Sequence, residues 1–480
     1  MPRPRLSTSL LICTVLACLA GAQPALASHG QITYFEGATE LLEPPTRAES
    51  FRRLEKLGVK ALRVELYWAS VAPSPDSATK PAFEATNPAA YEFSRYDAVL
   101  GEAQRLHWPV LLTVTGPAPR WATSNHTAPY ITRPDPQDFR EFMTAVAKNF
   151  GSEVSVYSIW NEPNHPAFLL PQWNTNGTPA SPRIYRALYQ YGYEGLQAAG
   201  LAHPKVLFGE TAPTGYDTAN VRREGSKALL HDVAPLLFLR SALCLNSRYH
   251  RVGSCSELPM SGYAHHAYTV PAGPYSIDPL PDSVEIGTLS RLSKALDKAA
   301  AAHAIPAGVP IYLTEFGVQT FPNQLGVSYA KQAEFDAISE HIAWLNPRVA
   351  AFSQYLLKDD PKGGAAGSSV HGGTVGFQTG LLSASGTPKP LYSGWPVPLT
   401  VTRRHGGVSL WGLIRPAQGA TRLTILIRSG HSSRYRVLKT IRTDSHGYWT
   451  LNSSTPATYW RVRWTSPAGV TYEGPPIRAY

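Results

Sequence analysis

Cysteine is scarce in this chain of 480 residues, which contains only four. Two of them fall within the first 20 residues, so Cys244 and Cys255 are the pair that remains for the rest of the chain. Histidines do not stand at ligand spacing around this pair, which argues against a zinc site. In an oxidising compartment such a pair is typical of a disulfide. We expect one bond that closes a short loop and contributes about 3 kcal/mol, with two free thiols as the alternative.

A hydrophobic run long enough to span a membrane is also missing after the N-terminal segment. Two arginines precede an apolar stretch over residues 10–20, which is short for a bilayer span, and Ala25-Leu26-Ala27 fits a small-residue cleavage site. We therefore predict a signal peptide over residues 1–27 and secretion of the mature protein as a monomer. Two alternatives stay open: an uncleaved anchor helix, and a lipoprotein that uses Cys18.

Charged residues make up only 16% of the chain, and they are unevenly placed. Residues 401–480 hold twelve Lys and Arg against two Asp and Glu, whereas the rest of the mature chain is nearly neutral. No nucleic-acid-binding motif accompanies this charge, so we expect no nucleic-acid partner. We expect salt-sensitive adsorption to an anionic surface, such as acidic cell-wall polymer or lipid head groups. A role in solubility alone is the alternative.

What the sequence does have is a long alternation of strand-like and helix-like segments from residue 31 to about 355. The helix-like stretches with amphipathic spacing include Arg47–Leu57, Pro136–Phe150, Arg183–Ala199, Val284–Ala302 and Ala330–Leu345. The strand candidates are Gln31–Glu36, Ala61–Tyr67, Pro109–Thr115, Ser155–Trp160, Val206–Gly209, Gly262–His266, Pro310–Thr314 and Ala350–Leu356. This alternation predicts an α/β fold, a (β/α)8 TIM barrel, over residues 28–395. A glycine-rich run over residues 363–369 is a candidate lid on the barrel rim.

Beyond residue 395 the hydrophobic period changes to two. Trp395-Pro396-Val397-Pro398 indicates a linker, which we assign to residues 396–400. Strand candidates then follow at regular spacing: Leu410–Ile414, Arg422–Ile427, Tyr435–Ile441, Tyr448–Leu451 and Tyr459–Thr465. This pattern predicts a small all-β sandwich of immunoglobulin or fibronectin type over residues 401–480.

Two glutamates stand at the ends of predicted barrel strands. Glu162 lies in Trp160-Asn161-Glu162-Pro163-Asn164 after the fourth strand candidate, and Glu315 lies in Thr314-Glu315-Phe316-Gly317 after the seventh. The carboxyl ends of barrel strands surround the site on this fold, so both side chains should reach one opening. Two carboxyls about 5–5.5 Å apart cleave a glycosidic bond through a covalent intermediate. Close like charges keep one of them protonated near neutral pH.

Further polar and aromatic residues fall near the same predicted opening. Arg63 is placed to stabilise an ionised Glu315, Tyr268 to orient it, and His266 to contact Glu162 or a sugar hydroxyl. Asn161 suits a sugar hydroxyl because an amide both donates and accepts hydrogen bonds. We expect structural roles for His265, which faces the other way along its strand, and for Glu210. Loop aromatics are candidate platforms for sugar rings: Trp121, Tyr130 and Trp173.

The two glutamate motifs together resemble those of the clan A glycoside hydrolases, nearest in pattern to families five and thirty-nine. The resemblance covers residues 30–395. It implies a (β/α)8 barrel, retention of anomeric configuration, a poly- or oligosaccharide substrate, and no cofactor or metal. Carried over by position, it makes Glu162 the acid/base and Glu315 the nucleophile, with a supporting set of Asn161, Arg63, His266 and Tyr268.

The chain departs from family five at two strands. The third strand ends in Thr115-Gly116-Pro117 without that family's histidine, and the eighth strand lacks its tryptophan. We therefore keep open the sugar, the linkage and endo or exo action. An inactive carbohydrate-binding barrel and a transglycosylase that uses the same residues are the alternatives to a hydrolase.

Overall fold

The computed structural model describes residues 28, 30–126, 128–361, 376–430 and 432–480. The predicted signal peptide and the glycine-rich lid candidate both lie outside these ranges. Across the described ranges, none of the helices combines the length and apolar character that a bilayer crossing requires.

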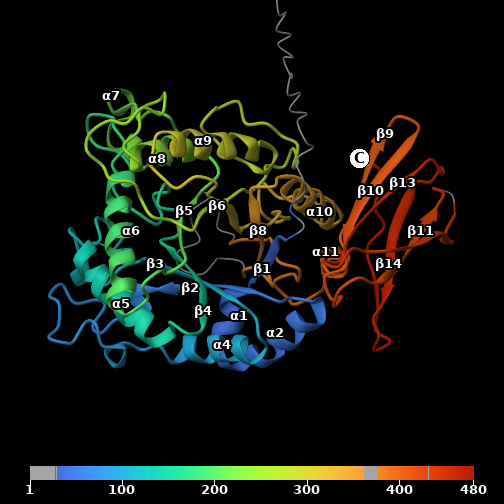
Figure 1. The fold of residues 1–480 in the computed structure, drawn as a ribbon, viewed down its shortest axis with the longest axis horizontal. Coiled ribbons are helices and arrows are strands. Elements are labelled where there is room, and N and C mark those ends of the chain that lie inside the picture. The colour runs from blue at the N-terminus through green and yellow to red at the C-terminus, as the bar shows by residue number, and fades with distance from the viewer. Residues whose placement is uncertain (1–27, 29, 127, 362–375, 431) are drawn as a thin grey trace, which may run out of the picture.

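Eight parallel strands close into a barrel in sequence order, which confirms the predicted (β/α)8 fold (Figure 1). The observed bounds differ from the predicted ones by no more than two residues at either end of any strand. The strands are β1 Ile32–Glu36, β2 Leu62–Tyr67, β3 Val110–Thr115, β4 Val154–Ile159, β5 Val206–Thr211, β6 Gly262–His266, β7 Ile311–Glu315 and β8 Val349–Tyr355.

Helices cover the outside of the barrel. They are α1 Ala38–Leu42, α2 Pro44–Leu57, α3 Trp68–Val71, α4 Ser94–Arg105, α5 Pro136–Phe150, α6 Ser181–Ala198, α7 Val221–Glu224, α8 Pro235–Ala242, α9 Leu289–Ala301, α10 Tyr329–Leu345 and α11 Pro390–Gly394. Helix α5 starts at the residue that the sequence predicts, and its first turn shows the cause. Pro136 occupies this turn, and the Asp135 side chain accepts hydrogen bonds from the amides of Gln137 and Asp138. The buried residues of α5 recur at helical spacing and include Phe139, Phe142, Met143, Val146 and Phe150.

The floor of the barrel interior is a mainly apolar ring. Each strand contributes one residue to it, except that Ala61 immediately precedes β2. The members of the ring are buried or nearly so: Tyr34, Ala61, Leu111, Val156, Leu207, Ala264, Tyr312 and Ala351. Alternate residues of a strand point to the same side of a sheet. The residue two positions further along each strand therefore faces the space directly above this ring, and that space holds the site.

The C-terminal segment folds into two antiparallel sheets, as the sequence predicts. One sheet has the order β13-β10-β9 and the other β12-β11-β14-β15, and they share a core that includes Trp449, Trp460 and Trp464. The strands are β9 Leu399–Arg404, β10 Gly407–Leu413, β11 Arg422–Arg428, β12 Arg436–Arg442, β13 Tyr448–Ser453, β14 Tyr459–Thr465 and β15 Thr471–Glu473. The first and last of these were not anticipated from the sequence, and β9 begins within the residues that we assigned to a linker.

The three-stranded sheet packs directly on the barrel. Trp344 of α10 contacts Trp411 of β10 and Tyr448 of β13 in one buried cluster. Beside it, the Arg415 guanidinium donates to Glu340 at 2.6 Å, and both side chains are almost fully buried. The four-stranded sheet consequently turns its outer face away from the barrel, at the right edge of Figure 1.

The predicted disulfide is present. It joins Cys244, just after α8, to Cys255, with the two Cα atoms 6.2 Å apart. This lies within the usual span for a bridged pair.

Candidate active site

A polar layer lies directly on the apolar floor of the barrel. Four of its members stand two residues after floor residues on the same strands: Glu36, Arg63, Thr113 and His266. On these strands the sequence thus changes from apolar to polar within one strand period. A layer of this kind, open toward the carboxyl ends of the strands, is where this fold carries its chemistry.

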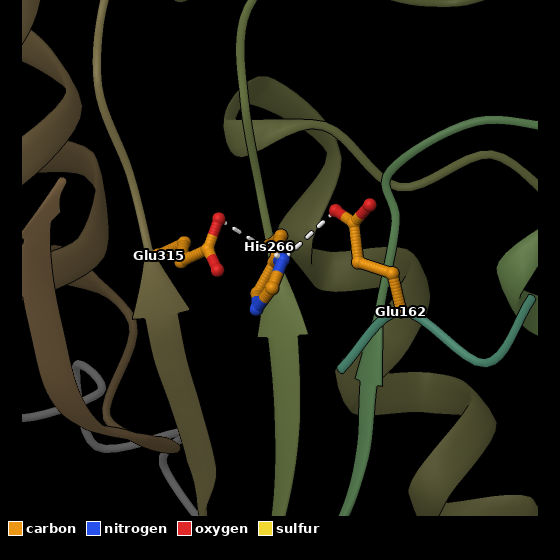
Figure 2. A group of neighbouring side chains, drawn as sticks. All are labelled: Glu162, His266 and Glu315. Carbon is orange, nitrogen blue, oxygen red and sulfur yellow. Dashed lines mark hydrogen bonds and ion pairs between the residues drawn. The ribbon is translucent and has the colours of Figure 1, made fainter. Parts of the chain in front are cut away.

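The two predicted catalytic carboxyls meet above this layer. Glu162 follows β4 and Glu315 ends β7, yet one carboxylate oxygen of each and a ring nitrogen of His266 lie within 4.8 Å of one another. Figure 2 shows His266 between the two glutamates, with all three side chains projecting at the strand ends. Glu162 and Glu315 keep 9% and 6% of their surface exposed, whereas Glu36 and Glu210 keep none. Glu65 keeps 5%, so the catalytic pair and Glu65 are the carboxyls of the cluster that a substrate can reach, and Glu36 and Glu210 are closed off.

Arg63 of β2 is the charge around which the acidic residues gather. Its buried guanidinium donates to side-chain oxygens of five residues: Glu36, Glu315 Oε1 at 2.9 Å, Glu210 Oε2 at 2.8 Å, Asn161 Oδ1 at 3.1 Å and Glu65 Oε1 at 3.3 Å. Burial disfavours the Arg63 cation, but these carboxyls raise its pKa well above its ordinary value. Arg63 is thus a permanent positive charge that fixes the position of Glu315.

Glu315 has a second fixed contact in Tyr268. The Tyr268 hydroxyl donates to Glu315 Oε2 at 2.9 Å, and burial together with the neighbouring carboxylate raises the pKa of that hydroxyl well above 10. Burial also raises the pKa of Glu315, against the lowering effect of His266 and Arg63. Both oxygens of Glu315 accept hydrogen bonds, so its orientation is set from two sides.

His266 positions the other carboxyl. Its Nδ1 lies 2.8 Å from Glu162 Oε1 and 3.5 Å from Glu315 Oε2. Burial lowers the pKa of His266, while Glu315 and Glu210 act to raise it. Through the hydrogen bond at Nδ1, the His266 ring fixes the position of Glu162.

The backbone after β4 is held in an unusual conformation. Trp160 and Glu162 have φ values of 68° and 35°, in a region that non-glycine residues rarely adopt and that costs about 1–3 kcal/mol each. The Trp160 indole donates to the Phe168 carbonyl at 2.9 Å, and its ring lies where a Cβ on Gly116 would come within 2.6 Å. Gly116, which follows β3, therefore leaves space for the Trp160 ring, and the packing of this ring directs Glu162 toward the opening.

Sequence reasoning missed most of the carboxyls around Arg63. Glu36 and Glu65 received no role, and Glu210 was expected to be structural. In the structure Glu210 accepts from Arg63 and, at 2.8 Å, from the Thr113 hydroxyl, while Glu65 accepts from Tyr67 at 2.5 Å. Two signals were available: Glu36 ends β1, and Glu65 stands two residues after Arg63 on β2.

Two of the three predicted sugar platforms are wrong. Trp121 and Trp173 are buried, and their indole nitrogens donate to backbone carbonyls of Pro73 and His231 at 3.1 and 2.8 Å. Trp121 packs edge-on against Trp68, with centroids 6.0 Å apart, so it belongs to the core. Tyr130 is half-buried, and its role stays a prediction.

His265 is the buried structural histidine that the sequence predicts. Its Nδ1 lies 2.9 Å from the Thr211 hydroxyl and its Nε2 lies 2.7 Å from the Val284 carbonyl oxygen. Burial lowers its pKa to about 3, so it remains neutral.

The acidic cluster invites comparison with a metal centre. Oxygens of Glu36, Glu65 and Glu315 lie within 4.8 Å of one another, the spacing of cation ligands. All three carboxyls, however, already accept hydrogen bonds from Arg63. Burial raises the pKa of Glu36 well above its ordinary value, against the lowering effect of Arg63. A cation here would have to compete with the guanidinium, and the cluster fits an arginine-centred network better than a metal site.

Comparison with known proteins bears on the fold. No protein-family model and no curated protein matches the sequence. Two solved structures align with most of the chain at a TM-score of 0.50. One is a glucosidase from Croceicoccus marinus, with 12% identity over 90% of this chain and 94% of that one. The other is a monomeric beta-xylosidase from Caulobacter crescentus CB15, with 13% identity over 95% of each chain. The chain therefore has the fold of these glycoside hydrolases, a TIM barrel followed by β-sheets.

Proposed function

We propose that this protein is a secreted retaining glycoside hydrolase that cleaves β-linked poly- or oligosaccharides for catabolism. The observation that carries the proposal is the approach of Glu162 and Glu315, whose nearest oxygens lie within 4.8 Å at the mouth of the barrel. Retaining enzymes hold their two carboxyls about 5–5.5 Å apart, whereas inverting enzymes leave about 6.5–9.5 Å for a water molecule.

In the first step Glu162 donates its proton to the glycosidic oxygen while a Glu315 oxygen attacks the anomeric carbon. The glycosidic bond breaks, the leaving sugar departs as an alcohol, and a glycosyl ester of Glu315 forms. In the second step Glu162, now a carboxylate, takes a proton from water as the water oxygen attacks the same carbon. Glu315 leaves as a carboxylate, and two displacements together give retention.

The supporting residues act through the two carboxyls. Arg63 and Tyr268 stabilise the ionised form of Glu315 and fix its approach, and His266 fixes Glu162. Asn161 is held beside Arg63 and next to Glu162 in the chain, because its Oδ1 accepts from Arg63 and its backbone amide donates to Thr115 Oγ1 at 2.9 Å. That placement supports a role in binding the hydroxyl next to the anomeric centre.

The charge of the site favours a neutral sugar in the glycone position. Four carboxyls, those of Glu36, Glu65, Glu210 and Glu315, lie within salt-bridge distance of the single cation of Arg63. A uronate would add another negative charge to a desolvated acidic pocket, which is unfavourable. The names of the two similar structures, a glucosidase and a beta-xylosidase, agree with a neutral glycone.

Product stereochemistry tests this proposal. We expect aryl β-glycosides of neutral sugars to be hydrolysed with the β-anomer appearing first by proton NMR, followed by slow mutarotation. The matching aryl β-glucuronide should be a poorer substrate than the β-glucoside. First appearance of the α-anomer would contradict the double displacement. A folded protein that binds glycans without turning over any aryl glycoside would favour the inactive binding barrel, and transfer to added sugar acceptors in place of water would favour a transglycosylase.

Replacement of Tyr268 by phenylalanine should move the acidic limb of the pH profile. Attack requires ionised Glu315, so kcat/KM falls as pH drops through the pKa of this group. Loss of the Tyr268 hydroxyl removes a hydrogen bond to the carboxylate and raises that pKa further. Because a hydrogen bond to a charged group is lost, we expect the acidic limb of kcat/KM to move by about 1–2 pH units toward higher pH.

Tyr189→Phe is the matched control for this change. Its hydroxyl is also buried but donates to the Pro259 carbonyl, away from the carboxyls. We expect its acidic limb to coincide with that of the wild type. An unshifted limb in Tyr268→Phe would exclude the proposed contribution of Tyr268 to the ionisation of Glu315.

A further inference from the structure

The outer face of the four-stranded sheet carries a concentration of arginines that the proposed hydrolysis does not use. Residues of β11 and β14 that alternate with the buried core residues point outward there. We call this surface the basic face and define it by Arg422, Arg428, Tyr435, Arg442, Tyr459, Arg461 and Arg463. Glu473 of β15 is its acidic residue and pairs with Arg461 and with Arg463, the latter at 2.6 Å.

Two arginines of the basic face repel each other across the sheet. Arg422 of β11 and Arg442 of β12 are directly opposed in the antiparallel register, and both are exposed. Like charges in this position destabilise a sheet. Among the described residues neither guanidinium has a carboxylate within salt-bridge distance. An external anion would neutralise this opposed pair.

The centre of the face is an alternating stack of guanidinium groups and tyrosine rings. The Arg428 guanidinium lies 3.9 Å from the Tyr459 ring centroid and 5.4 Å from that of Tyr435. The guanidinium of Arg461, on β14, lies 4.6 Å from the Tyr435 ring centroid. A further guanidinium, that of Arg478, lies 4.8 Å from the Tyr459 centroid, so each of the two rings contacts two arginines.

Stacking fixes the planes of these guanidinium groups, while Arg428 Nη1 donates to the Ser432 carbonyl at 3.0 Å and Arg461 pairs with Glu473. The exposed Arg422 and Arg442 are therefore the guanidinium groups of the face best placed to bind a planar anion.

We propose that the basic face is a docking site for an anionic polysaccharide that carries carboxylates, a polyuronate. The charge of the face selects an anion, and guanidinium edges match carboxylates in a bidentate geometry. Arg422 and Arg428 stand at the two ends of β11, and Arg442 lies beside Arg422 across the sheet, so the face presents cations both along and across the strand to an extended polymer. The acidic pocket of the barrel disfavours the same ligand, so the polyuronate serves as an anchor and a neutral sugar as the proposed substrate.

The test uses the full-length chain, because the three-stranded sheet is packed on the barrel and removal of the domain would expose Trp344. Binding to polygalacturonate is measured by isothermal titration calorimetry at two salt concentrations. Fully methyl-esterified polygalacturonate is the uncharged control. We expect the double variant Arg422→Ser/Arg442→Ser to bind about 25-fold more weakly, a factor of about five for each arginine.

Arg403→Ser/Arg404→Ser is the matched control, because it removes the same charge from β9 of the other sheet. We expect it to bind polygalacturonate like the wild type. Equal losses in the two double variants would indicate diffuse attraction and overturn the proposal. Undiminished binding of the esterified polymer, or tighter binding to duplex DNA or to anionic lipid vesicles of matched charge concentration, would also overturn it. Turnover of a neutral aryl glycoside is measured in parallel, and its absence bears on the proposed hydrolysis alone.

Discussion

Glu315→Gln is expected to abolish turnover of aryl β-glycosides, with a loss in kcat of roughly 10⁴-fold or more, as removal of a covalent nucleophile does in other enzymes. The amide has nearly the same size as the carboxylate and keeps an oxygen for the bond from Arg63. It lacks the negative charge that attacks the anomeric carbon. Initial rates with an activated dinitrophenyl glycoside measure the loss in kcat, because departure of this leaving group needs no general acid.

The control for this change is Glu84→Gln, an exposed glutamate outside the site. It should turn over substrate like the wild type. Circular dichroism and a thermal melt establish that Glu315→Gln is folded, since removal of a negative charge beside Arg63 alters a buried network. Residual activity within tenfold of the wild type in the folded variant would be incompatible with Glu315 as the nucleophile, whatever the role of Glu162.

The barrel was predictable because its signals are local and repeated. The strands are short apolar runs that alternate with amphipathic helices, and α5 shows how closely a start signal sets a boundary. The C-terminal domain was harder. β9 follows Pro396 and Pro398, which indicate a linker when read alone, yet its partner β10 supplies the hydrogen bonds that make it a strand. The strand β12 was predicted within one residue of its observed bounds, although its register shifts opposite Ile425 and Leu426.

The site was predictable to the extent that it depends on strand ends. Glu162 and Glu315 stand at such ends, and barrel closure brings them together. The partners of Arg63 depend instead on the stagger between strands, because Glu36, Glu210 and Glu315 come from three other strands. No local pattern encodes which of several inward carboxyls reaches one guanidinium.

Loop aromatics could not be assigned by the same reasoning. Trp121 and Trp173 were predicted to stack on sugars because they fall in loops at the correct end of the barrel. Each instead turns its indole inward to a backbone carbonyl. A tryptophan in a loop is placed by what the loop folds against, and the sequence carries no period from which that can be read.

Glu162→Ala is expected to slow hydrolysis in proportion to the need of the leaving group for a proton. With a poor leaving group, such as an alkyl glycoside or an unactivated disaccharide, kcat/KM should fall by roughly 10²–10⁴-fold, the usual contribution of general acid catalysis. With a dinitrophenyl glycoside the glycosyl ester of Glu315 still forms, and its hydrolysis becomes rate-limiting because no base activates water. A plot of log kcat/KM against leaving-group pKa measures the difference in slope between variant and wild type.

Added azide separates the two carboxyl roles by the stereochemistry of its product. In Glu162→Ala the small anion enters the space of the missing side chain, attacks the anomeric carbon of the glycosyl ester and releases Glu315 as a carboxylate. It needs no base, so turnover of the dinitrophenyl substrate recovers and a β-glycosyl azide accumulates. In Glu315→Ala azide occupies the opposite face of the sugar and displaces the leaving group once, which gives the α-azide. If Glu162→Ala yields the α-azide, the two roles are exchanged, because the anomer formed reports which face of the sugar has lost its carboxylate.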